Sequence, residues 1–192
     1  MNLKISLLAS ALAVACGALT LAPAAQAVTS PSSTITFQGR VVADSCVITV
    51  TGGTASVAGG AASGLVTLPT VYTTDLTAVG AVAGKTPFAI SLTGCDSSFT
   101  SAQTLWNAGS DLSASGGRLK NLSGSNVDVQ LLNASNVAMD LSQSTATAQN
   151  SPTVSFSSGA ATLNYSAQYY ATATSTTAGA VNTSVQFTMI YQ

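Results

Sequence analysis

The fold is decided by the stretch Gly179-Ala180-Val181-Asn182-Thr183-Ser184-Val185-Gln186-Phe187-Thr188-Met189-Ile190-Tyr191-Gln192. Val185, Phe187, Met189 and Tyr191 recur at every second position, with Ser184, Gln186 and Thr188 alternating with them, which predicts a β-strand with one buried face. We expect this strand to be the last of its sheet, with no later segment to pair with its far side. A long apolar strand with an open edge is prone to pair with another chain, so we expect a partner to cover it.

The other end of the chain predicts export. Lys4 is followed by an apolar run from Ile5 to Leu21 and then by small residues that end in Ala25-Gln26-Ala27. This is the pattern of a signal peptide over residues 1–27 with an A-x-A cleavage site, so we expect the mature chain to begin at Val28. Two alternatives stay open: a transmembrane anchor, for which the run is short, and a lipoprotein site at Cys16.

The composition of the mature chain excludes several classes of function. Removal of 27 residues from the 192 leaves 165, a length that suits one domain with a hydrophobic core. Charged residues are 6% of the sequence and His is absent. So few basic residues argue against a nucleic-acid partner, which requires a basic patch. Without His, neither a Ser-His-Asp or Cys-His catalytic arrangement nor the common kind of zinc site is available.

We therefore predict that the protein is not an enzyme and has no cofactor and no metal site. Six scattered Asp residues could supply a carboxylate pair for glycosidase chemistry, but no spacing singles out two of them. Trp106 could stack on a sugar, although a lone Trp in a short strand is more often a core residue.

Two cysteines remain after export, and in an oxidising compartment they predict one disulfide, Cys46–Cys95. The bond would close a loop of about 50 residues, which in the chain-entropy model stabilises the fold by roughly 4 kcal/mol.

Alternating apolar residues and turn signals predict six main strands and no helix of useful length, which favours an all-β sandwich. After a first strand that comprises Val41-Val42 and Cys46–Val50, with a break near Ala43-Asp44, residues 51–64 read as a Gly/Ala/Ser-rich loop and 70–86 as irregular. The further predicted strands lie at 65–68 (short), 88–92, 104–106, 127–131, 163–171 and the C-terminal stretch, with a hairpin between 127–131 and 137–141.

Four segments in this order resemble a known family. They are Gly39-Arg40-Val41-Val42 leading to Cys46, Phe88-Ala89-Ile90-Ser91-Leu92-Thr93-Gly94-Cys95, Tyr165-Ser166-Ala167-Gln168-Tyr169-Tyr170-Ala171, and the C-terminal strand. The chain resembles the chaperone–usher pilins, and in particular major type 1 fimbrial subunits. Gly179, fourteenth from the C-terminus, and Tyr191, the penultimate residue, agree with the pattern of that family.

The resemblance implies an incomplete immunoglobulin-like sandwich of six main strands that lacks its seventh. It implies a donor-strand extension at 28–38 and a pilin domain at 39–192. Ile35 and Phe37 would fill pockets of the neighbouring subunit, and Ser33 stands where the family usually has Gly. The receiving groove and chaperone-binding strand would comprise Gly179, Val185, Phe187, Met189 and Tyr191.

The implied function is that of a structural subunit of a surface fimbria that supports cell adhesion. Its partners would be other pilin subunits in a head-to-tail polymer, a periplasmic chaperone and an outer-membrane usher, and it would pass through the periplasm to the cell surface. Alternatives are a minor or adaptor pilin, or a free-standing secreted immunoglobulin-like binding module. The 28–37 segment could also be an ordinary first strand of a complete sandwich, and the C-terminal strand a plain sheet edge buried by its own domain.

Overall fold

The computed structural model describes residues 46–58 and 61–192, all within one compact unit, Arg40–Gln192. The predicted signal peptide, the donor segment with Ser33, Ile35 and Phe37, and the Val41-Val42 pair lie outside the described residues. None of the helices in the described part of the chain is long and apolar enough to span a membrane.

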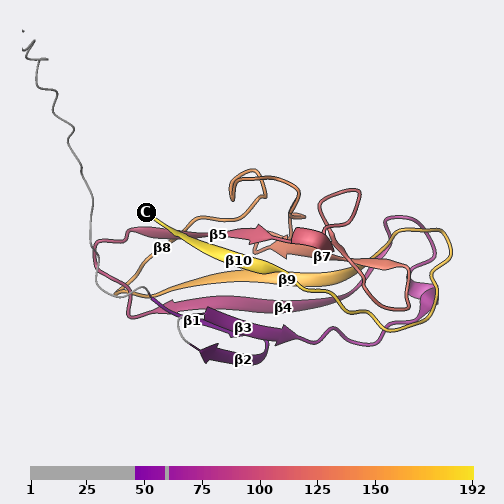
Figure 1. The fold of residues 1–192 in the computed structure, drawn as a ribbon, viewed down its shortest axis with the longest axis horizontal. Helices are drawn as coiled ribbons and strands as arrows, with labels where there is room; N and C mark the ends of the chain where they lie inside the picture. Colours follow the sequence, from indigo (N-terminus) through magenta and orange to yellow (C-terminus); the bar gives the residue numbers. More distant parts are fainter. Residues whose placement is uncertain (1–45, 59–60) are drawn as a thin grey trace, which may run out of the picture. The chain divides into compact units, whose positions relative to one another are not determined.

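The described residues form ten strands and two short 3-10 helices and no α-helix (Figure 1). The strands are β1 (Val47–Thr51), β2 (Gly53–Ala58), β3 (Ala61–Val66), β4 (Val82–Thr93), β5 (Ser101–Asn107), β6 (Leu119–Lys120), β7 (Val127–Asn133), β8 (Val154–Ser155), β9 (Ala161–Ala171) and β10 (Gln186–Tyr191). The 3-10 helices are η1 (Thr73–Asp75) and η2 (Gly109–Asp111). The prediction of an all-β protein is confirmed.

Two antiparallel sheets make the sandwich, and a hairpin is added beside them. The larger sheet has the order β1-β4-β9-β7-β6, and the smaller has the order β10-β5-β8. Strands β2 and β3 pair only with each other. Strand β4 pairs with β9 over most of its 12 residues and with β1 over its last five, Ala89 to Thr93, so it links β1 to the rest of the larger sheet.

The core between the sheets is aromatic at its centre. Phe88 of β4 and Tyr165 of β9 meet Trp106 of β5 edge to face, with ring centroids 6.1 and 5.2 Å apart, a favourable geometry for aromatic pairs. Trp106 is only 4% exposed. It is therefore a core residue that joins the two sheets, and its ring is not available on the surface to stack on a sugar.

Three details of the strand prediction were wrong. Residues 51–64 are not a loop, since most of them lie in the β2–β3 hairpin, and the strand expected at 65–68 is the end of β3. Small residues have weak strand propensity, but the six-pair ladder of this hairpin supplies the backbone hydrogen bonds that propensity does not predict. Strand β4 begins at Val82, within the segment expected to be irregular, because β9 is long enough to pair with it there.

The third detail concerns the hairpin expected after β7, which is much shorter than predicted. Asn133 N–H donates to the carbonyl of Val137, and Met139 N–H donates to the carbonyl of Leu131. Beyond Leu141 the chain leaves the sheet for a turn-rich loop that returns only at β8.

Candidate strand-acceptor groove

Strand β10 is an edge strand. It pairs antiparallel with β5 from Gln186↔Asn107 to Tyr191↔Ala102, and among the described residues no strand pairs with its other side. Its outer row of backbone N–H and C=O groups is thus left without a ladder in this part of the chain. Such a row is a template for another strand.

The side chains along β10 alternate as the sequence predicts. Val185, Phe187, Met189 and Tyr191 are half-buried and pack against the core, while Gln186 and Thr188 are exposed. None of the four apolar side chains is fully buried, although they lie on the inward face. An apolar row that the described residues cover only in part leaves surface for a further chain to bury.

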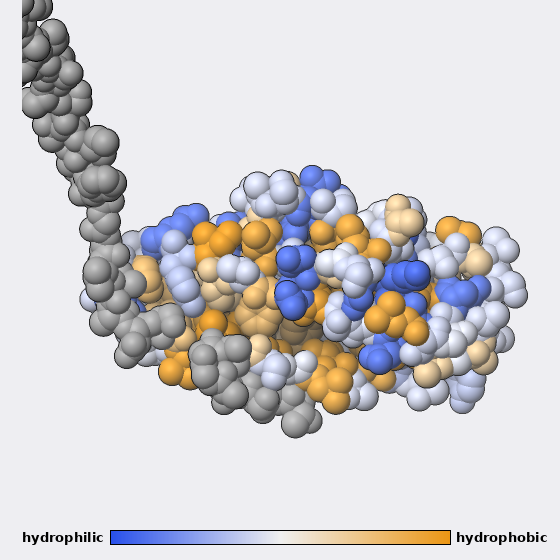
Figure 2. Space-filling view, in the orientation of Figure 1, coloured by the Kyte–Doolittle hydropathy of each residue, from blue (hydrophilic) through white to orange (hydrophobic). Residues whose placement is uncertain are grey.

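A hollow runs beside this strand. β10 is the outer strand of the small sheet and β1 is the outer strand of the large one. In the view of Figure 1, β10 lies above β9 and β4, with β1 and β3 below them, and in Figure 2 hydrophobic atoms lie in a hollow on this face. Ile48 of β1, Val66 of β3 and Leu68 are among the partly buried residues that pack on the same core.

Two side chains of the apolar row make aromatic contacts with the rest of the domain. Phe187 lies against Trp106 with ring centroids 5.7 Å apart, and Tyr191 stacks on Phe99 at 4.9 Å. Burial raises the pKa of the Tyr191 hydroxyl above its usual value. Trp106 Nε1, Thr183 Oγ1 and the Tyr191 hydroxyl are buried and have no hydrogen-bond partner among the described residues.

Gly179 stands where a side chain does not fit. A Cβ there would lie 2.8 Å from the carbonyl carbon of Gly124 and 2.9 Å from the nitrogen of Ser125. Both are backbone atoms, so the clash could be relieved only by moving the chain. Close approach of two backbones, rather than an unusual φ angle, therefore accounts for the glycine at this position.

The structure brings together the predicted acceptor residues Val185, Phe187, Met189 and Tyr191 along one edge, with Gly179 at the turn that leads to them. It corrects the extent of the strand, because the ladder covers only Gln186–Tyr191. The sequence reasoning missed Asp111 and Asn121, whose side chains hold residues 180–184. Both lie between the strands predicted at 104–106 and 127–131, in the Gly/Ser-rich residues 111–124, where no periodic pattern marks them.

The family model for FimA, type-1 fimbrial protein A, matches residues 68–192 of this chain. The major fimbrial subunit SMF-1 of Stenotrophomonas maltophilia (strain K279a) is 39% identical over an alignment of 178 residues, with 89% of this chain and 99% of that protein covered. The chain belongs to the type-1 fimbrial protein family. The F17 fimbrial protein of Escherichia coli is 40% identical over 168 residues, with 82% of this chain and 86% of that protein covered.

Solved structures of fimbrial proteins share the fold. An antigen and type I fimbria protein of Burkholderia pseudomallei aligns with a TM-score of 0.52 and 24% identity, over 76% of this chain and 97% of that chain. The P pilus rod subunit PapA aligns with a TM-score of 0.55 and 17% identity, over 72% and 99%. Both neighbours support the sandwich, and the pilin fold is immunoglobulin-like.

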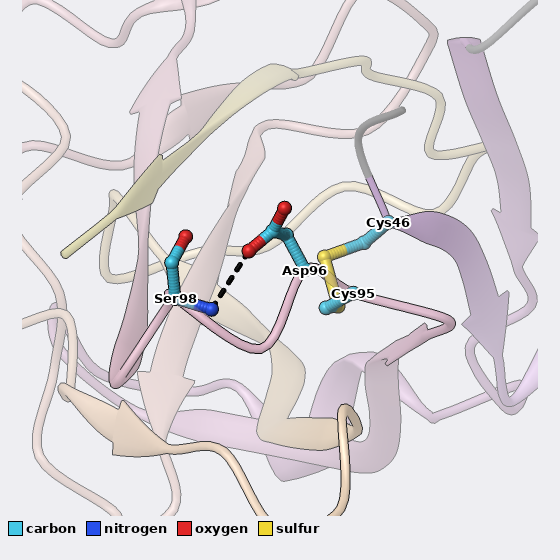
Figure 3. The surroundings of a disulfide bond; sticks show 4 residues. All are labelled: Cys46, Cys95, Asp96 and Ser98. Carbon is cyan, nitrogen blue, oxygen red and sulfur yellow. Dashed lines mark hydrogen bonds between the residues drawn. A yellow bond between two sulfur atoms is a disulfide. The ribbon is translucent and has the colours of Figure 1, made fainter. Parts of the chain in front are cut away.

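This fimbrial family member carries the predicted disulfide. Cys46 and Cys95 are bonded, with Cα atoms 4.3 Å apart, across a sequence separation of 49 (Figure 3). The bond joins the residue before β1 to the segment after β4, next to a turn in which Ser98 N–H donates to the Asp96 carboxylate at 2.7 Å. β1 and β4 are paired antiparallel, so the disulfide closes one end of an edge ladder of the larger sheet.

Proposed function

We propose that this fimbrial subunit is a structural unit of a surface fimbria and that it polymerises by donor-strand exchange. The edge of β10 supports the proposal: it combines a backbone row without a ladder in the described residues and an apolar side-chain row that is only half-buried. Addition of a strand to an open sheet edge is a general mode of protein recognition, and complexes in which a chaperone donates a strand to a pilin are a known example.

The occupant in the polymer would be the segment 28–38 of the next subunit. Ile35 and Phe37 share one face of that segment, and their burial would contribute about 1.5–3 kcal/mol each. Each backbone hydrogen bond along β10 would add roughly 1 kcal/mol. A head-to-tail contact between identical units that does not close on itself builds a filament rather than a ring.

Before assembly, the same edge would be covered by a strand of a periplasmic chaperone, and an outer-membrane usher would mediate the exchange. Export through the periplasm to a fimbria at the cell surface follows from this route, and adhesion would be a property of the assembled fibre. The low charge of the sequence, with 6% Asp, Glu, Lys and Arg, is in keeping with a structural unit whose contacts are apolar and backbone-mediated.

The proposal is tested by substitutions on the two faces of the donor segment. Ile35→Asp and Phe37→Asp should abolish fibres seen by electron microscopy, because a charge cannot enter an apolar pocket without a large cost. Thr34→Asp and Thr36→Asp, on the opposite face, are the matched controls and should leave fibres. Equal effects of the two pairs, or a mature chain that is a stable soluble monomer when made without a chaperone, would refute donor-strand exchange.

A further inference from the structure

The segment that leads into β10 is held by side chains instead of a neighbouring strand. Asn121 accepts a hydrogen bond from Asn182 N–H at 2.8 Å and donates one to the carbonyl of Ala180 at 3.1 Å. Asp111 accepts from Ser184 N–H at 3.2 Å and from the Ser184 hydroxyl at 2.7 Å. Asn121 and Asp111 are each only 9% exposed.

Two backbone contacts complete this arrangement. Leu122 N–H donates to the carbonyl of Asn182 at 2.8 Å, and Ser125 N–H donates to the carbonyl of Ala180 at 3.2 Å. Every residue held in this way, 180, 182 and 184, has an even number. Hydrogen bonds at every second residue toward one side are the pattern of an extended chain in an antiparallel ladder.

The same parity continues through β10. Gln192 and Ser101 exchange both backbone hydrogen bonds, at 2.9 and 3.2 Å, so the even-numbered residues of β10 are the ones that pair with β5. The odd-numbered backbone groups from 181 to 191 consequently face the opposite side. Within the described part of the chain, no backbone group of residue 181, 183 or 185 makes a hydrogen bond.

Side-chain burial follows the same rule. Val181, Thr183 and Val185 are half-buried while Asn182 and Ser184 are exposed, which continues the alternation of β10 without a break. Val181 and Val185 pack on the same core as Phe187. The Thr183 hydroxyl oxygen is buried without a partner among the described residues, so this inward face also carries a polar group that a further chain could satisfy.

We propose that Asn121 and Asp111 are positioning residues that replace a neighbouring strand for residues 180–184 and so extend the acceptor edge from Gln186 back to Val181. This inference rests on the proposed function, and its occupant is the leading segment of a second copy. At about 3.4 Å per residue, the six residues of β10 span roughly 20 Å and the edge from 181 to 191 roughly 37 Å. The predicted donor segment, residues 28–38, would also span roughly 37 Å, which fits only the longer edge.

Hydrogen exchange in polymers of the full wild-type chain, resolved to single amides, tests the inference. The amides of Val181, Thr183 and Val185 should exchange as slowly as those of Phe187 and Met189. Slow exchange at 187 and 189 with fast exchange at 181–185 would overturn the extended edge and leave donor-strand exchange intact. Fast exchange at all five amides would overturn both.

Variants test the assigned role. Asn121→Ala and Asp111→Ala should each speed exchange at residues 181–185 by about tenfold, the equivalent of roughly one hydrogen bond, with little change at 187 and 189. Asp111→Asn keeps an oxygen that can accept from Ser184 and should restore slow exchange. Asn126→Ala is the matched control, because Asn126 holds Ser175 and Thr177 in the preceding turn instead. If exchange at residues 181–185 is unaltered in the Asn121 and Asp111 variants, these two side chains do not position the segment. The wild-type measurement tests the extent of the acceptor edge even where a variant fails to fold.

Discussion

The side-chain amide of Gln149 pairs with both backbone polar groups of Trp106. Trp106 N–H donates to Gln149 Oε1 at 2.9 Å, and Gln149 Nε2 donates to the carbonyl of Trp106 at 2.8 Å. Gln149 is fully buried, and its amide also donates to the carbonyl of Gln143 at 2.9 Å. One side chain thus takes the place of a strand residue beyond the short β8, on the side of β5 away from β10.

This pairing gives the two edges of the small sheet opposite properties. Past Ala102, where the ladder with β8 ends, the β5 edge is covered by the loop that carries Gln149. At the other edge, β10 has no neighbour among the described residues. Of the two edges of the small sheet, only the β10 edge is therefore open to the strand addition proposed above.

We expect Gln149→Leu to lower the free energy of unfolding by about 2–5 kcal/mol, because it leaves the buried N–H and C=O of Trp106 without partners. Urea unfolding of wild type and variant, purified in the same state, measures the loss. Gln143→Leu is the matched control in the same loop, where the side chain is exposed and donates a hydrogen bond to the Asp140 carboxylate; it should change stability by less than about 1 kcal/mol. Equal losses in the two variants would contradict the role given to Gln149.

Gly179→Ala should destabilise the subunit by about 1–3 kcal/mol, as overpacking against fixed atoms does, and should reduce fibre yield. Gly124→Ala is the reciprocal control, because its Cβ would find nothing closer than 3.8 Å. Thermal unfolding and fibre mass from sheared cells measure the two effects. If Gly179→Ala has wild-type stability and fibre yield, the close approach to the backbone of Gly124 and Ser125 does not require glycine at this position.

Reduction of the Cys46–Cys95 bond, or the double substitution to Ser, should lower stability by about 4 kcal/mol in the chain-entropy model. Unfolding with and without a reducing agent measures the difference. The double variant should no longer respond to the reducing agent, and a response would assign the effect to something other than this bond.

Acid should weaken the subunit through two aspartates. Hydrogen bonds from the Ser184 hydroxyl to Asp111 and from the Ser142 hydroxyl to Asp140 hold the pKa of both carboxyls below the ordinary value of 3.8. Their contribution is complete above pH 3.8, the unfolded value, and is lost as the pH falls through the lower folded values. Since the sequence has no His, stability should be nearly flat between about pH 5 and 8.

Urea midpoints measured from neutral pH down to below pH 3.8 test whether the two aspartates cause the loss of stability in acid. In Asp111→Asn, the urea midpoint should fall less in acid than it does in the wild type, because one of the two carboxylates is absent. A variant with an unaltered acid response would show that Asp111 contributes little.

Periodic patterns were sufficient to predict the parts of the fold that depend on burial. Phe88, Ile90 and Leu92 are buried on one face of β4 as their spacing predicts, and the row from Val185 to Tyr191 lies inward as expected. The two cysteines could be paired because no other thiol remains after export. These features are local, since each needs only the period of a strand or a count of residues.

What could not be predicted depends on partners distant in the sequence. The β2–β3 hairpin consists mostly of small residues, and their strand state is set by pairing. Asn121 and Asp111 hold a segment that lies 59 to 73 positions later in the chain, and Gln149 pairs with a residue 43 positions earlier. A single polar residue in a loop has no periodicity, so its burial and its partners appear only in the folded structure.

The burial of Trp106 beside Phe187 has a practical consequence. It is the only tryptophan of the sequence, and its indole nitrogen has no partner among the described residues. Indole emission responds to the polarity and packing of its surroundings, so the molecule carries an intrinsic fluorophore in contact with Phe187, on the edge where we propose that a strand is added. Fibre growth can then be followed in real time by ultraviolet fluorescence, with no dye attached and no alteration of the chain.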